Sequence, residues 1–119
     1  MKYIEQLLQR VIDQAAEGNT SFCVLLESKK SPNRWVQLSW DTINAAYPFA
    51  EDPTTKIRDL ELPEFAYLEI SGWEPSKFAT FEHGAVKLDE ISAFVTSYFK
   101  NVLGVSAAKK DMRIEEQQL

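Results

Sequence analysis

The residues that could carry out chemistry are few and lie far apart along this chain. His83 is the only histidine and Cys23 the only cysteine, so no pair of zinc ligands occurs at helical or hairpin spacing. Cys23 also lies inside an apolar run, where a thiol usually packs as a small hydrophobic group. His83 precedes Gly84 and is most simply a turn residue. We therefore expect neither a metal site nor a Cys–His nucleophilic pair.

The carboxylates follow no spacing typical of an acid–base pair. Three are surface-like and three lie in the polar C-terminal segment: Glu61, Glu64, Glu69, Asp111, Glu115 and Glu116. Serine and aspartate without a suitably placed histidine do not make a catalytic triad. The four glycines are scattered and form no phosphate-binding loop. The sequence predicts that the protein is not an enzyme and uses no cofactor or metal.

Aromatic side chains are the remaining candidates, and we take them as partner-binding residues. The candidate set is Trp35, Phe22, Gln37 and Trp73. Alternation along 34–40 places Trp35 on the face opposite Val36 and Leu38. That face is either covered, which makes Trp35 a core residue and is the favoured placement, or exposed, which makes it part of a recognition surface. Trp73 follows Gly72, and we expect it to pack back on the preceding element.

The composition indicates one soluble domain. The chain has 119 residues with 45% hydrophobic residues, enough for a core, and we assign 1–105 to a single domain. It shows no signal peptide and no apolar run of membrane-spanning length, so we expect a cytoplasmic protein that does not bind membranes. The net charge of −5 argues against non-specific nucleic-acid binding, which requires a basic surface.

Two long amphipathic helices must position these residues. Apolar side chains recur at spacings of three and four over 2–17 and 88–103. Gly18 and Gly104 follow them, where a helix commonly ends in a left-handed residue.

Short strands are predicted between the helices. A near-continuous apolar run at 21–27 is typical of a central strand that is covered on both faces. Residues 34–40 complete a hairpin with Val36, Leu38 and Trp40 on its core face, and 78–82 is a third strand. Asp41 is expected to cap a short helix at 42–46.

Three segments are less regular. We expect a surface loop at 51–61. Residues 62–71 fit a strand by residue content and a helix by their flanking Pro63 and Gly72. The polar tail 106–119 has no apolar period and is predicted to be disordered, or a frayed helix that needs a partner. This element order predicts an α+β fold, with an antiparallel sheet of about three to five strands flanked by long N- and C-terminal helices.

Two stretches resemble a known family. The strand Arg34–Leu38, RWVQL, resembles the aromatic-Val-Gln-apolar strand of the type III secretion chaperone-like superfamily, the YbjN-like peptide-binding chaperones. The corner ISGWEP at 70–75, followed by a short strand and a long helix, is similar to an arrangement in the same proteins. The resemblance implies a compact α+β fold, often a homodimer, that holds an extended peptide against a sheet or helix surface. It also implies a helix at 62–71.

Two functions follow as hypotheses. The first is a non-enzymatic module that binds a protein or peptide, as the resemblance implies, at an exposed apolar groove or sheet edge. The alternative is a small acidic immunity or inhibitor protein that neutralises a toxin or enzyme through an acidic cluster. The acidic candidates are Glu51, Asp52, Asp59, Glu61 and Glu64. An apolar groove or an acidic convex patch would distinguish the two.

Overall fold

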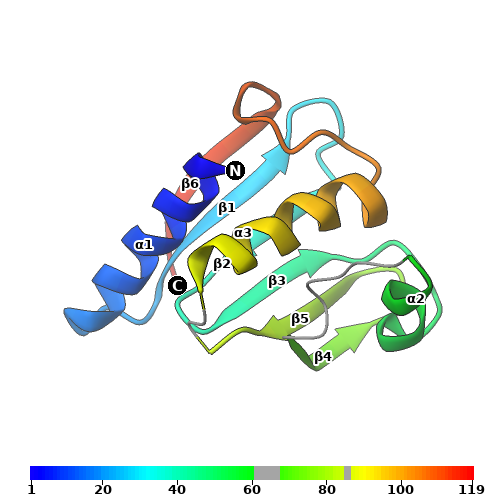
Figure 1. The fold of residues 1–119 in the computed structure, drawn as a ribbon, viewed down its shortest axis with the longest axis horizontal. Helices are drawn as coiled ribbons and strands as arrows, with labels where there is room; N and C mark the ends of the chain where they lie inside the picture. The colour runs from blue at the N-terminus through cyan, green and yellow to red at the C-terminus, as the bar shows by residue number, and fades with distance from the viewer. Residues whose placement is uncertain (61–67, 85–86) are drawn as a thin grey trace.

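The fold was analysed in a computed structural model that describes residues 1–60, 68–84 and 87–119 (Figure 1). These residues form an α+β single-domain fold with three α-helices and six strands. The helices are α1 (Lys2–Ala16), α2 (Pro53–Asp59) and α3 (Leu88–Ser97), and α3 continues as a π-helical turn, Tyr98–Val102. The strands are β1 (Phe22–Ser28), β2 (Trp35–Leu38), β3 (Thr42–Ala46), β4 (Glu69–Glu74), β5 (Phe78–Glu82) and β6 (Met112–Gln118).

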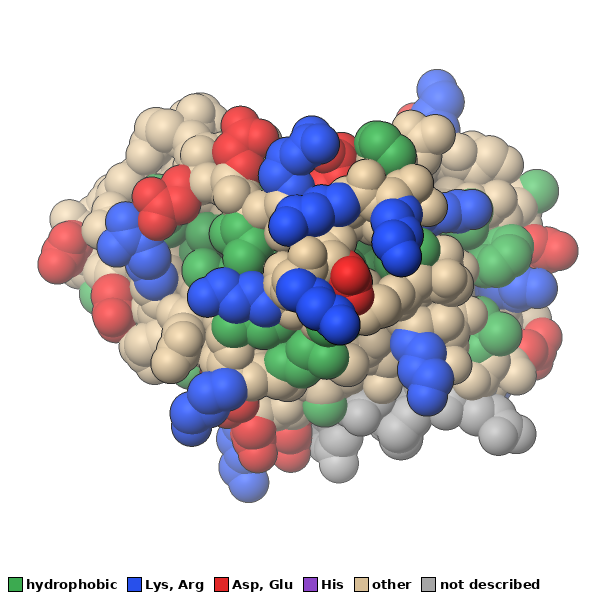
Figure 2. Space-filling model, turned by 90° about the horizontal axis from the view of Figure 1, so that it is seen from above, with side chains coloured by type: hydrophobic (Ala, Val, Ile, Leu, Met, Phe, Trp, Pro, Cys, Tyr) green, Lys and Arg blue, Asp and Glu red, His purple; other side chains and the backbone are tan. Residues whose placement is uncertain are grey.

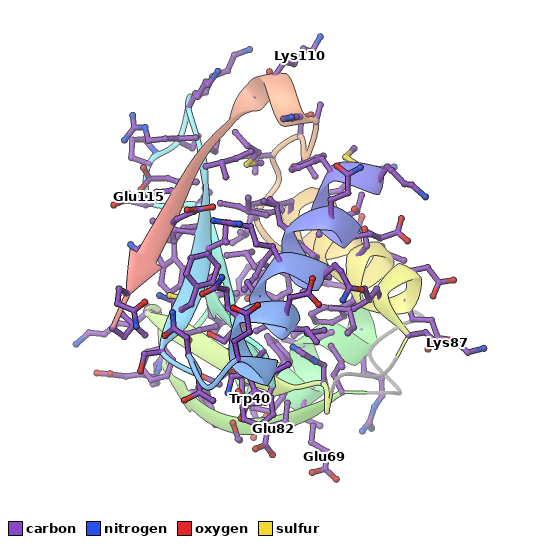
Figure 3. The ribbon with its side chains drawn as sticks, turned by 90° about the vertical axis from the view of Figure 1, so that its left-hand side faces the viewer. Trp40, Glu69, Glu82, Lys87, Lys110 and Glu115 are labelled. Carbon is purple, nitrogen blue, oxygen red and sulfur yellow. The ribbon has the colours of Figure 1, made fainter. Side chains whose placement is uncertain are left out.

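The strands form one antiparallel sheet in the order β4-β5-β3-β2-β1-β6. The class predicted from the sequence is therefore correct, but the sheet has six strands rather than three to five, and the chain ends in a strand. The apolar run at 21–27 forms β1, which pairs with β2 on one side and β6 on the other. It is an interior strand, as predicted, but the long helices α1 and α3 lie on only one of its faces rather than both (Figure 1, Figure 3).

Helices α1 and α3 lie against the same face of the sheet, as Figure 1 shows. Beneath them lie the apolar side chains of alternate strand positions, including Val24, Val36 and Phe81, which are all fully buried. Phe94 of α3 meets Phe81 edge-on with ring centroids 5.1 Å apart. Tyr98 donates a hydrogen bond of 2.7 Å to the Ala46 carbonyl and so joins the end of α3 to β3. Both long helices were predicted correctly from their apolar spacing.

Residues 42–46 and 53–59 do not have the predicted secondary structure. Residues 42–46 form strand β3 rather than a helix capped by Asp41, since Ile43 and Ala45 enter the core and the segment bonds to strands on both sides. The predicted loop at 51–61 contains helix α2. Asp52 caps it by accepting a 2.8 Å hydrogen bond from the Thr54 N–H, and Ile57 is fully buried.

The segment 62–71 lies partly outside the described residues. Residues 61–67 are not described, and Glu69–Glu74 is strand β4. The helix implied by the family resemblance is therefore wrong for residues 69–71. Trp40 was expected on the core face of its hairpin, but β2 ends at Leu38 and Trp40 is 38% exposed.

The C-terminal tail is ordered, which corrects the prediction of disorder or a frayed helix. Strand β6 pairs with β1 over seven residues, from Phe22↔Gln118 to Ser28↔Met112. Met112 is buried and Ile114 packs against the core. Met112 and Ile114 alternate with polar residues, as expected for a strand with one covered face, but two apolar residues are too few to show a period.

Candidate binding groove and uncovered sheet face

The sheet face opposite α1 and α3 carries polar side chains in neighbouring strands. Gln37 on β2 faces Asn44 on β3, which faces Thr80 on β5. The Thr80 hydroxyl donates to the Asn44 side chain at 3.0 Å, and the Gln37 amide donates to Gln117 of β6 at 3.0 Å. Figure 3 shows both long helices on one side of the sheet, with Glu115 on the other side. Among the described residues, no helix covers this polar face, which we call the open face.

Trp35 lies at one end of the open face. It stands opposite Glu27 of β1 and is half-buried, with part of its ring packed against the core. Glu27 forms an ion pair of 3.0 Å with Arg113 of β6, so this end of the face is polar on the β1 side. Trp35 therefore combines the two placements considered from sequence: it packs at the margin of the core and still presents surface to solvent.

A groove of about 620 Å³ begins beside Trp35. Its lining comes from three segments of the chain: residues 31–35, residues 46–48 and the pair Ser76 and Lys77. Strands β1 and β2 place the first segment through their turn, β3 runs into the second, and the β4–β5 turn supplies the third. The groove thus opens between two turns that the sheet brings together at one end.

Backbone hydrogen bonds hold both walls of the groove. On one wall, the Arg34 N–H donates to the Ser31 carbonyl at 2.9 Å. On the other, the Ser76 N–H donates to the Phe49 carbonyl at 2.9 Å and the Tyr47 N–H donates to the Lys77 carbonyl at 3.1 Å. These bonds tie the β4–β5 turn to the segment after β3. The groove is therefore formed by fixed backbone rather than by side chains alone.

Tyr47 lines the groove from beneath, and its phenol does not act as a base. It is 1% exposed, and its hydroxyl donates to the Glu51 carbonyl. Burial, together with the nearby charges of Glu51 and Asp52, raises the pKa of Tyr47 to about 12. The phenol stays protonated at neutral pH, so it acts as a hydrogen-bond donor and a packing surface rather than as a base.

Lys and Arg side chains gather on the upper side of the molecule (Figure 2), and two cations line the groove. Figure 2 looks onto the upper end of the view in Figure 1 and shows Lys and Arg side chains grouped there. Arg34 and Lys77 line the groove, and the Lys29 side chain donates to the Lys110 carbonyl at 3.0 Å, which joins the β1–β2 turn to the turn before β6. We call the set Lys29, Lys30, Lys109 and Lys110, from the two turns that this bond joins, the basic end. An acidic chain therefore carries a locally cationic surface.

The structure brings together two of the four predicted partner-binding residues. Trp35 and Gln37 lie two residues apart on β2 and share the open face. Phe22 is instead 8% exposed in the core, with the Arg10 guanidinium 5.3 Å from its ring. Trp73 is half-buried on β4 and meets the Tyr47 ring edge-on at 6.3 Å. Phe22 and Trp73 are therefore packing residues, as the sequence suggested for Trp73.

The groove residues Arg34, Ser76 and Lys77 were not singled out from sequence. The turn Glu74-Pro75-Ser76-Lys77 carried the available signal: proline at the second position fits a type II turn, whose third position needs positive φ. Ser76 has φ of +59° and the Lys77 N–H donates to the Glu74 carbonyl at 3.1 Å. A serine where glycine is preferred could have marked this turn as unusual.

His83 and Cys23 occupy buried positions. The His83 ring Nε2 lies 3.0 Å from the Ser39 carbonyl, and burial lowers its pKa below 6.5. Cys23 is 1% exposed, its sulfur lies 3.7 Å from the Gln117 side-chain oxygen, and burial raises its pKa. A raised pKa opposes thiolate formation. No group of three His, Cys, Asp or Glu side chains suited to a metal ion occurs within residues 1–60, 68–84 and 87–119.

The acidic residues considered for an inhibitor that fall on or beside α2 are interspersed with basic ones. Asp52 caps α2 at its start and Asp59 ends it, while Lys56 and Arg58 lie between them on the same helix. Lys56 sits over the Phe49 ring at 4.4 Å. Glu61 and Glu64 lie outside the described residues.

No protein-family model, curated protein or solved structure matches this chain significantly. Within the described part of the chain, the helices are too short or too polar to cross a membrane.

Proposed function

We propose that this protein is a non-enzymatic module that binds an extended peptide segment of a partner protein. The groove beside Trp35 carries the proposal, because it is concave, is bordered by a half-buried aromatic ring, and leads onto a sheet face that no described helix covers (Figure 3). Its 620 Å³ volume is in the range of sites that accept several side chains.

The groove lining can bind both the backbone and the side chains of a peptide. Trp35 and Pro48 offer apolar surface, and Asn33 and Gln37 offer side-chain amides that can bond to a peptide group. Aromatic rings with few rotatable bonds are frequent anchors in such sites, since they lose little conformational entropy on binding. An extended segment can lie along the groove and continue over Trp35 toward Gln37.

Selection from a display library of random peptides tests this function directly. The protein is immobilised, and enriched sequences are resynthesised with a fluorophore and titrated by fluorescence anisotropy. Trp35→Ala should weaken binding at least about tenfold, the effect expected when a central aromatic anchor is removed.

Trp40→Ala is the matched control. Trp40 is also a partly exposed tryptophan, but it follows the opposite end of β2 from Trp35. It should leave binding unchanged. Failure to enrich any peptide, or equal losses in the two variants, would contradict the proposed site.

A further inference from the structure

We infer that the groove recognises an acidic side chain or terminal carboxylate of the bound peptide, through Arg34, Lys77 and Ser76. This inference rests on the proposed function and specifies its ligand class. Arg34 comes from the β1–β2 turn and Lys77 from the β4–β5 turn, so the cations belong to different walls of the groove.

Both cations remain available to bind a ligand, because neither is fully neutralised by a described carboxylate of this chain. Among the described residues, Arg34 makes no ion pair. Lys77 pairs with Glu74 at 2.9 Å, but the side chains are 67% and 49% exposed, and such surface pairs contribute little. A carboxylate in the groove can therefore engage Arg34 in a two-pronged hydrogen bond while Lys77 adds a second charge.

Ser76 is the residue that points most specifically to a ligand. It is the one non-glycine residue with positive φ in the described part of the chain, and this conformation is costly for a residue with a Cβ atom. Glycine would adopt it without strain. Strained residues often persist where the side chain serves a site, and Ser76 lines the groove on the same wall as Lys77. A hydroxyl there can donate to a carboxylate oxygen.

The wider charge distribution agrees with this assignment. The basic end lies next to the first wall of the groove, because Lys29 and Lys30 directly precede the lining residues 31–35, and its charge attracts an acidic segment during its approach. The phosphates of a nucleic acid offer similar chemistry, but a long polyanion would also meet the acidic remainder of a chain with net charge −5. A short acidic peptide segment avoids that repulsion, so we assign the carboxylate.

Comparing peptide selections against two proteins separates this inference from the proposed function. The parent should enrich peptides that contain Asp or Glu, and Arg34→Gln should lose that preference while still enriching apolar peptides. Lys87→Gln, which removes a cation at the start of α3, is the matched control and should behave as the parent. Enriched peptides with no acidic preference would overturn this inference alone, whereas the absence of any enriched peptide would overturn both.

Two variants at Ser76 test the strained residue. Ser76→Gly and Ser76→Ala both remove the hydroxyl and should weaken binding of an enriched acidic peptide about fivefold, the size of one hydrogen bond. Only the glycine variant relieves the backbone strain at position 76, so its melting temperature should be equal to or higher than the parent's. The alanine variant keeps the strain, so its melting temperature should not rise. If both variants bind as tightly as the parent, Ser76 has no part in recognition.

The acidic peptide is finally competed with oligothymidylate and with inorganic phosphate. Weak competition by both supports a carboxylate ligand. Displacement by oligothymidylate at a lower concentration than by the unlabelled peptide would overturn the assignment in favour of a nucleic-acid phosphate backbone.

Discussion

Met112→Ala tests whether the C-terminal tail belongs to the folded core. Met112 begins β6 opposite Ser28 of β1 and is only 3% exposed. Truncating a fully buried methionine to alanine costs about 2–5 kcal/mol through lost transfer free energy and the cavity left behind. Met112 lies at the end of an edge strand, where neighbours can relax into the space, so we expect the lower part of this range, about 2–3 kcal/mol.

Equilibrium urea unfolding followed by tryptophan fluorescence measures this loss. With a urea dependence of about 1–3 kcal/mol per molar, typical of small domains, the midpoint should fall by about 1 M with an unchanged slope. Glu115→Ala is the control in the same strand, because Glu115 is exposed on the open face (Figure 3) and should change stability by less than about 0.5 kcal/mol.

The result that refutes this reasoning is a Met112→Ala midpoint equal to that of the control. A disordered tail would give that result, since its residues would be solvated before and after unfolding. A chain ending at Asp111 extends the test: it removes the pairing of β6 with β1 and should be less stable than Met112→Ala. A truncated chain as stable as the parent would likewise contradict the ordered strand.

Three further predictions concern buried side chains. Phe94→Asp places a charge at a position that is 1% exposed and should unfold the protein or cost more than about 4 kcal/mol, whereas a melting temperature within a degree or two of the parent's would refute the core placement. Because burial lowers the pKa of His83, the unfolded chain binds more protons below pH 6.5, so stability should fall as the pH drops through that value. His83→Gln should remove this part of the pH dependence of stability in urea titrations. An unchanged profile would show that another group causes the pH dependence. Cys23, buried and with a raised pKa, should resist a thiol reagent such as 5,5′-dithiobis(2-nitrobenzoate) in the native state and react in urea, and rapid native labelling would contradict its burial.

The elements predicted correctly are those whose signals are local. Helices α1 and α3 bury one stripe each, so their apolar spacing appears directly in sequence. Strand β1 appears as a near-continuous apolar run because Val24 and Leu26 enter the core and Cys23, on the other face, is also buried. The α+β class followed from the order of these elements.

The errors fall where distant segments decide local structure. The sequence of 42–46 has modest preferences, and only pairing with β2 and β5 makes it a strand. The tail becomes β6 because β1 offers it an unpaired edge. Helix α2 is different: Asp52 and Pro53 were local signals of a helix start, and the surrounding polar composition obscured them.

By itself, the sequence determined the two amphipathic helices and the interior strand, because each depends on residue type and short-range spacing. Only the tertiary structure decided that the face shared by Trp35 and Gln37 is the one that no described helix covers (Figure 3) and that Phe22 enters the core, since alternation fixes relative faces but not which face is covered. It also joined Arg34, Ser76 and Lys77 into one groove. More than forty residues separate the two turns in the chain, and their approach depends on how β3 and β5 pair within the sheet.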